Sequence, residues 1–232
     1  MSLPPLALLA GGMATRLGAL SRDKPKSLVD VNGRPFIDHQ LAWLRGQGVE
    51  RVVVCTGHLG KQIQDHVGDG AAHGLSVDYS YDGPSLVGTG GALKKALPQL
   101  GGAFFVLYGD SYLDVGFRAL AAAWDPATAD AVMTVWRNDG ALAPSNVEYS
   151  KGRVLAHAKL ERTPAMRHID YGLGLVAAAP LAAEPLESFD LSWFYGKLLR
   201  QGRLAGFEVP RRYYEAGSLE GLEALRAHLS GT

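Results

Sequence analysis

Short apolar runs alternate with amphipathic segments along the first half of the chain. Apolar or alternating runs of strand length occur at residues 6–10, 52–56, 75–81 and 104–108. Segments whose apolar residues recur at helical spacing lie between or beside them, at residues 35–47, 59–67 and 89–100. Strands that alternate with helices of this length predict a parallel sheet with right-handed crossover connections.

The pattern changes after about residue 129. Extended segments then follow one another with few helices between them, at residues 131–137, 146–149, 153–159, 172–177 and 204–209. A helix is predicted at residues 190–201, and Ser218 is a good N-cap for a last helix. We therefore expect an α/β fold, with a Rossmann-like, mixed and mostly parallel sheet flanked by helices and a small additional β-rich lobe.

No linker-like stretch divides the 232 residues, so we expect one domain with two parts, residues 1–128 and 129–232. Lysine plus arginine and aspartate plus glutamate both number 23, and this zero net charge argues against nucleic acid as a partner. The chain has no apolar stretch of membrane-spanning length and no signal-peptide pattern at its start, which predicts a cytoplasmic protein without a membrane partner.

The first strand ends at two glycines that can bring backbone amides close to an anionic ligand. Gly11 and Gly12 are followed by Arg16, and Lys26 lies ten residues further on. The spacing fits neither the Walker A pattern nor the dinucleotide fingerprint G-x-G-x-x-G. Taken alone, these residues describe a tight turn with solvated charges equally well.

The wider sequence resembles the sugar-1-phosphate nucleotidyltransferase family. Residues 9–17 read LAGGMATRL where the family has LAGGxGTRL, and residues 24–36 follow its PKxLxPVxGxP pattern. Residues 86–93, 107–110 and 214–218 continue the resemblance in the family's order. The segments look closest to the heptose-1-phosphate guanylyltransferase and N-acetylmuramate-1-phosphate uridylyltransferase branches. The resemblance implies an enzyme that converts a nucleoside triphosphate and a sugar 1-phosphate into a nucleotide sugar and pyrophosphate.

The resemblance also assigns site residues. Arg16 and Lys26 would be the catalytic cations. Nucleotide binding would involve Leu9, Ala10, Gly11, Gly12, Met13, Ala14, Thr15, Gly88, Thr89, Gly90 and Gly91. Sugar binding would involve Asp110 together with Asn146, Lys159, Asp170 and Gly172 of the β-rich lobe. Asp110 and Glu215 would hold Mg²⁺.

Two positions depart from the family. Ala14 replaces a glycine of the loop, and alanine disfavours the positive φ that glycine permits. Glu215 replaces the usual aspartate and is longer by one methylene, so direct coordination of the metal is left open. The reaction itself needs cations and a metal, because two anions must meet; it needs no general base, because a phosphate oxygen is already ionised at neutral pH.

Three interpretations follow. The first is guanylyl transfer to a heptose- or mannose-type 1-phosphate, by a monomer or homodimer. The second is uridylyl transfer to N-acetylmuramate 1-phosphate. The third is a non-catalytic nucleotide-sugar-binding module, which the departures at Ala14 and Glu215 motivate. Separately, the spacing of Trp136, Trp193 and Tyr195 favours core positions over base-stacking platforms.

Overall fold

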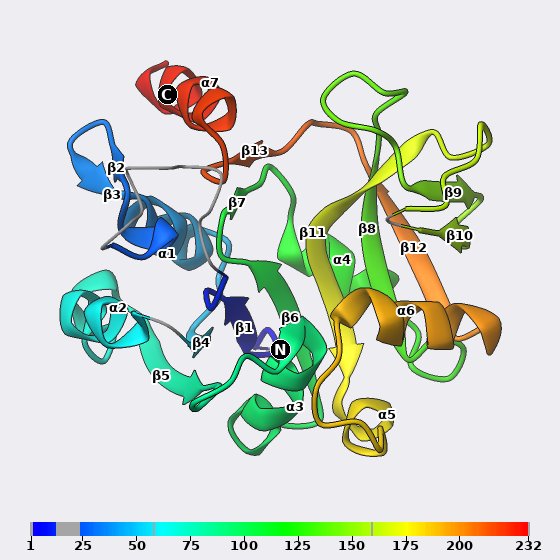
Figure 1. Cartoon of the computed structure of the whole chain (residues 1–232), viewed down its shortest axis with the longest axis horizontal. Coiled ribbons are helices and arrows are strands. Elements are labelled where there is room, and N and C mark those ends of the chain that lie inside the picture. The colour runs from blue at the N-terminus through cyan, green and yellow to red at the C-terminus, as the bar shows by residue number, and fades with distance from the viewer. Residues whose placement is uncertain (1, 13–23, 58, 159, 232) are drawn as a thin grey trace.

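A single nine-stranded sheet runs through the protein (Figure 1). The computed structural model describes residues 2–12, 24–57, 59–158 and 160–231. The strand order is β5-β4-β1-β6-β11-β8-β12-β10-β9. None of the helices within these ranges is long and apolar enough to cross a membrane.

The first half of the sheet is parallel, as its sequence pattern predicts. It comprises β1 (Leu6–Leu9), β4 (Arg51–Thr56), β5 (Ser76–Tyr81) and β6 (Ala103–Tyr108). β1 lies between β4 and β6, and all four of its side chains are buried. A continuous apolar run is typical of a parallel strand that is covered on both faces.

Helices cover both faces of this sheet. On one face, Leu6 and Leu8 of β1 pack in the same apolar cluster as residues of α1 (Phe36–Gly46), α2 (Gly60–Val67) and α4 (Phe117–Ala123). On the other face, Ala7 and Leu9 share a cluster with α3 (Gly88–Leu100), α5 (Ala178–Ala182) and α6 (Leu191–Arg200). Because side chains alternate along a strand, β1 serves both cores.

The second half extends the same sheet. It comprises β8 (Ala131–Arg137), β9 (Val147–Ser150), β10 (Arg153–His157), β11 (His168–Ala177) and β12 (Leu204–Val209). The long strand β11 pairs antiparallel with β6 on one side and with β8 on the other. The predicted mixed sheet flanked by helices is confirmed, and the β-rich part continues that sheet rather than standing beside it.

Several small elements gather around the last helix, α7 (Leu219–Ser230). They are the hairpin of β2 (Asp30–Val31) and β3 (Arg34–Pro35), the 3-10 helix η2 (Lys26–Leu28), and the pair β7 (Ser111–Tyr112) and β13 (Tyr214–Glu215). The other 3-10 helix, η3 (Ala71–His73), packs on α1 instead. Leu222 and Leu225 of α7 pack with Val31 and Phe36 in a third apolar cluster. This packing brings η2, the end of β6 and β13 together, although about 190 residues separate η2 from β13.

Two details of the sequence interpretation are decided by this packing. The Ser218 side chain accepts a hydrogen bond from the Gly221 amide at 3.0 Å, which confirms it as the N-cap of α7. Tyr195 is buried, and the half-buried Trp136 packs against the core. The prediction for Trp193 was wrong: its side chain is 41% exposed, because α6 turns Leu191, Phe194 and Leu198 inward instead.

Candidate active site

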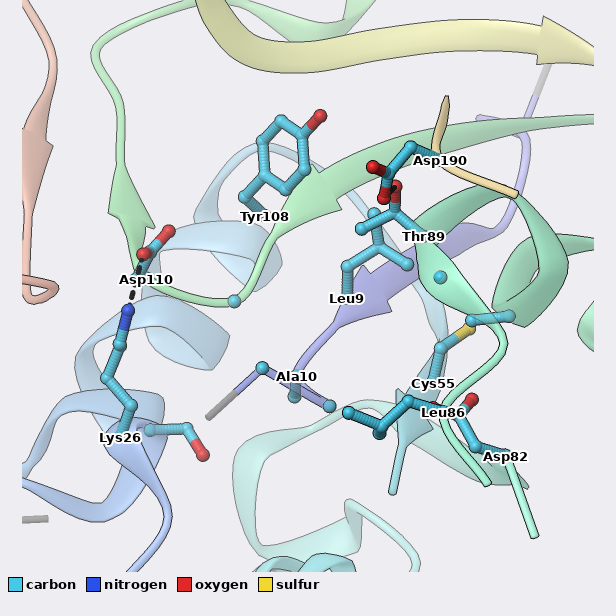
Figure 2. A pocket seen from close by; sticks show the side chains of 16 residues that line it. Leu9, Ala10, Lys26, Cys55, Asp82, Leu86, Thr89, Tyr108, Asp110 and Asp190 are labelled. Carbon is cyan, nitrogen blue, oxygen red and sulfur yellow. Dashed lines mark hydrogen bonds and ion pairs between the residues drawn. The ribbon is translucent and has the colours of Figure 1, made fainter. Parts of the chain in front are cut away.

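A cavity of about 240 Å³ opens at the carboxyl ends of the parallel strands (Figure 2). Open α/β sheets place their ligands at this edge. Its walls come from six segments of the chain: Leu9, Ala10, Gly11, Gly12, Lys26, Ser27, Cys55, Asp82, Leu86, Gly88, Thr89, Ala92, Tyr108, Gly109, Asp110 and Asp190. Most predicted nucleotide-binding residues that the structure describes therefore meet in one place.

The two loop glycines follow β1, beside the end of β4. The Ala10 amide donates a hydrogen bond to the Cys55 carbonyl at 2.8 Å. A side chain on Gly11 would lie 3.2 Å from the Gly57 nitrogen, whereas a side chain on Gly12 would meet no atom within 4 Å. Close packing thus leaves little room for a side chain at Gly11. Gly12 instead borders the open space of the cavity. Met13, Ala14, Thr15 and Arg16 lie outside the described residues, so their roles stay predictions.

At one end of the cavity, Lys26 pairs with Asp110. The Lys26 Nζ lies 2.9 Å from the Asp110 Oδ2, and both side chains are largely buried. Lys26 begins η2 directly after Pro25, and Asp110 follows β6 by two residues. The structure thus brings together Lys26 and Asp110, the cation and the carboxylate that the family resemblance implies.

Glu215 reaches the same end from β13. Its Oε2 accepts a hydrogen bond from the Gly217 amide at 2.7 Å, and its Oε1 accepts one from the Ser218 hydroxyl. Gly217 sits at the centre of the cluster: a side chain there would lie 2.9 Å from the Asp110 Oδ2 and 3.1 Å from the Lys26 Nζ. The longer glutamate is therefore folded back, and its carboxylate ends beside that of Asp110.

This pair of carboxylates fits magnesium. Mg²⁺ usually binds one or two protein carboxylates, while substrate phosphates and waters complete its octahedral shell. Within the described part of the chain, no group of three or more acidic, histidine or cysteine side chains could hold a metal by itself. The donor set thus suits an ion that is shared with a phosphate substrate.

The first four residues of α3 divide into two pairs. Gly88, with φ +74°, and Thr89 line the cavity. The amides of Gly90 and Gly91 instead donate to the Phe189 carbonyl at 2.9 and 3.2 Å. The amides of Gly90 and Gly91 therefore hold the Phe189 segment against α3 and are not free to bind a ligand.

A second hollow of about 500 Å³ shares Tyr108 and Asp110 with the first. Asp170 and Gly172, both predicted to contact the sugar, line it. Gly172 has a φ of +85°, and its amide donates to the Asp170 Oδ1 at 3.0 Å. The sugar contacts predicted for these two residues therefore have a place to form.

The remaining predicted sugar residues lie elsewhere. Asn146 does not line the second hollow; its Oδ1 accepts a hydrogen bond from the Asp170 amide at 3.0 Å. Asn146 thus supports Asp170 from behind. Lys159 lies outside the described residues, so the contact predicted for it is untested.

Sequence reasoning missed two carboxylates of the first cavity. Asp82 is only 6% exposed, and burial raises its pKa, an effect that the nearby Lys95 opposes. Asp190 precedes α6 and lies beside Thr89, with its carboxylate exposed to the cavity (Figure 2). Asp82 directly follows β5, so its place at the carboxyl end of a predicted strand was an available signal. Asp190 offered none, because only the folded chain brings it to α3.

Tyr108 separates the two hollows. Its pKa is raised well above the usual value by burial and, to a smaller extent, by the charges of Asp170, Asp110 and Asp190. The ring therefore forms a neutral wall between the carboxylates of the two sites.

Comparison with known proteins places this geometry in a family. Residues 6–186 match the model of the MobA-like NTP transferase domain. The chain is 39% identical over 113 residues to the N-acetylmuramate alpha-1-phosphate uridylyltransferase of Neisseria meningitidis, covering 48% of this chain and 49% of that protein. It is 31% identical over 113 residues to the D-glycero-alpha-D-manno-heptose 1-phosphate guanylyltransferase of Campylobacter jejuni, covering 49% and 50%. The chain thus spans about half the length of these curated relatives.

Solved structures agree on the fold over the full length. HddC from Yersinia pseudotuberculosis, determined as a complex with GMP-PN, superposes with a TM-score of 0.82 at 22% sequence identity. The superposition covers 98% of this chain and all of that one. With a family model that matches more than half of its residues, the chain belongs to the family of MobA-like NTP transferase domains.

Proposed function

We propose that the protein transfers a guanylyl group from GTP to a sugar 1-phosphate of the heptose or mannose type, releasing pyrophosphate. The observation that carries this proposal is the meeting of Lys26, Asp110 and Glu215 between two hollows, one suited to a nucleotide and the other to a sugar. The substrates are consistent with the names of relatives, which include both guanylyl- and uridylyltransferases.

The reaction is an in-line displacement. An oxygen of the sugar phosphate forms a bond to the α-phosphorus of GTP, and the bond between that phosphorus and the bridging oxygen to the β-phosphate breaks. Pyrophosphate leaves with the electron pair of the broken bond. Lys26 lies where two anions would approach each other, so its charge lowers their repulsion and stabilises the charge that builds up.

Nucleotidyltransferases of this family generally depend on a metal ion, and we propose magnesium. Asp110 and Glu215 would hold it. When bound, it would supply Lewis-acid stabilisation of the phosphate oxygens. Release of the Lys26–Asp110 ion pair would free the ammonium for the phosphates while the carboxylate turns to the metal.

Asp82 supports guanine as the base. Guanine presents two parallel donors, N1–H and the 2-amino group, which match the two oxygens of one carboxylate. Uracil presents a single N3–H between two carbonyl oxygens, and both of these would repel a carboxylate. Asp82 lies among the apolar cavity residues Cys55 and Leu86, where the faces of a base would pack (Figure 2).

Uridylyl transfer to N-acetylmuramate 1-phosphate is the second candidate, because the 39% identity to such an enzyme favours it. Pyrophosphate release, measured with magnesium across the common triphosphates and the three sugar 1-phosphates, tests both. We expect the highest kcat/KM with GTP. A preference for UTP with N-acetylmuramate 1-phosphate would select the alternative. If no pair of triphosphate and sugar 1-phosphate releases pyrophosphate, the interpretation as a non-catalytic binding module is supported.

We also propose a cytoplasmic location without nucleic-acid or membrane partners, because both proposed substrates are metabolites of the cytoplasm. Fractionation of the native host would test this.

A further inference from the structure

Asp190 has a carboxylate that its own helix does not use. It occupies the N-cap position of α6, where an aspartate normally accepts a hydrogen bond from the first turn. Here no such bond forms, and the Leu191 amide donates instead to the Thr89 hydroxyl at 2.8 Å. Thr89 in turn makes one long contact of 3.5 Å to the Asp190 Oδ1. The structure thus leaves most of the hydrogen-bonding capacity of this carboxylate open.

The negative charge of Asp190 limits which chemical group can bind beside it. Its carboxylate is exposed at the wall of the nucleotide cavity. Among the described residues, no lysine, arginine or histidine forms an ion pair with it. A carboxylate in this position repels phosphates and accepts hydrogen bonds from donors. The part of a nucleotide that suits the place beside it is therefore uncharged and carries donors.

The order of groups in the cavity narrows the choice. Lys26 and Asp110 mark the phosphate end, and Asp82 with Leu86 marks the base end; Asp190 and Thr89 lie along the wall between them (Figure 2). Asp190 and Asp110 are both close enough to Tyr108 to raise its pKa, whereas Asp82 is not among the charges that do so. The part of a nucleotide that lies between phosphate and base is the ribose.

We propose that Asp190 binds the 2′- and 3′-hydroxyls of the ribose and so makes the protein selective for ribonucleotides. The two hydroxyls of a ribose supply two donors on neighbouring carbons, and a carboxylate supplies two acceptors at matching separation. Thr89 acts as a positioning residue, because its hydroxyl holds both the start of α6 and the Asp190 side chain. The inference rests on the proposed function only in taking a nucleoside triphosphate as the ligand.

Equilibrium binding tests the proposal without turnover. The probes are GTP, 2′-deoxy-GTP and 3′-deoxy-GTP, titrated calorimetrically with magnesium and without sugar phosphate. Because hydrogen bonds to a charged group are strong, we expect each deoxy nucleotide to bind the unmodified protein about tenfold or more weaker than GTP. Equal Kd values for all three probes would overturn the proposal, and this comparison needs no variant to fold.

The variant Asp190→Ala completes a thermodynamic cycle. We expect it to weaken GTP most and each deoxy nucleotide less, because each of these keeps one of the two hydroxyls, so that the variant binds all three probes with similar affinity. Equal weakening of all three probes would contradict the proposal, because it would indicate a general effect on the cavity. Glu187→Ala is the matched control: it removes one negative charge from the same segment, outside the cavity, and should preserve the discrimination. If the probes bind with the expected discrimination but no pyrophosphate is released in any assay, only the proposed function fails.

Discussion

The two ends of the cavity that we propose for the nucleotide are built on different principles. At the phosphate end, Lys26, Asp110 and Glu215 come from three distant segments and already contact one another or the same backbone. At the other end, Asp82 is buried and Asp190 is exposed; both line the cavity, and neither forms an ion pair within the described part of the chain. A preassembled charge cluster suits a reacting centre, since exchange of the Lys26–Asp110 ion pair for contacts with phosphate and metal then needs only local movement of side chains. Carboxylates without partners suit recognition of a neutral ligand that brings its own donors. The following predictions separate these two roles.

The largest effect is expected from Lys26→Ala at the phosphate end. Loss of a preorganised positive charge at the reacting centre should lower kcat by about 100- to 1,000-fold. Steady-state pyrophosphate release measures it. Lys61→Ala is the control, because that lysine pairs with Asp65 on the exposed side of α2 and should keep full activity. A loss below tenfold for Lys26→Ala would place the reacting centre elsewhere.

Gly217→Ala tests whether the cluster depends on the space that glycine leaves. The new methyl group would press on Asp110 and Lys26, at 2.9 and 3.1 Å from their charged atoms. A displacement of reacting groups by about 1 Å lowers the rate by about 100-fold. We expect a lower kcat and a higher magnesium concentration at half-maximal rate. Gly102→Ala, where a side chain would meet nothing within 4 Å, should change neither value.

Acidification should weaken GTP at the nucleoside end. Burial raises the pKa of Asp82, so this carboxyl takes up a proton at a higher pH than an ordinary aspartate, whose pKa is about 3.9. Protonated Asp82 offers guanine one acceptor fewer. The Kd for GTP should therefore rise as the pH falls through the raised pKa of Asp82. The expected change is about tenfold. Asp82→Asn should bind GTP weakly at every pH; a pH response equal to that of the unmodified protein would assign the titration to another group.

The smallest effect is expected from Ser218→Ala. The substitution removes the N-cap of α7 and one hydrogen bond to Glu215. Loss of an N-cap costs about 1 kcal/mol of the free energy of unfolding. Urea denaturation followed by circular dichroism measures it, with Ser85→Ala in an exposed loop as the control. Unchanged stability would mean that the cap hydrogen bond contributes nothing in solution.

The charged end could be predicted from the sequence far better than the nucleoside end. Lys26 and Asp110 stand in short segments whose order and spacing carry the family resemblance, and local periodicity placed most strands and helices. Asp190 could not be predicted, because its function depends on α6 meeting α3 about 100 residues away. The exposed Trp193 shows the same limit: helical spacing tells which residues share a face, but only packing decides which face is buried.

The pairing of β11 with β6 could not be predicted either. About 60 residues separate the two strands, and the sequence of an apolar strand does not show whether its partner runs parallel or antiparallel. The sequence therefore indicated an added β-rich lobe, whereas the hydrogen bonds of β11 join the two parts into one sheet.

That pairing has a mechanical consequence. β6 carries Tyr108 at its end and leads to Asp110, while β11 carries Asp170 and Gly172, so two directly bonded strands bear the walls of both hollows. A continuous hydrogen-bonded sheet resists bending about the line between neighbouring strands and offers no hinge there. The distance between the two hollows, which we propose to bind nucleotide and sugar, is consequently fixed when the chain folds. Enclosure of the substrates must then come from loops at the rim, and not from rotation of one half against the other.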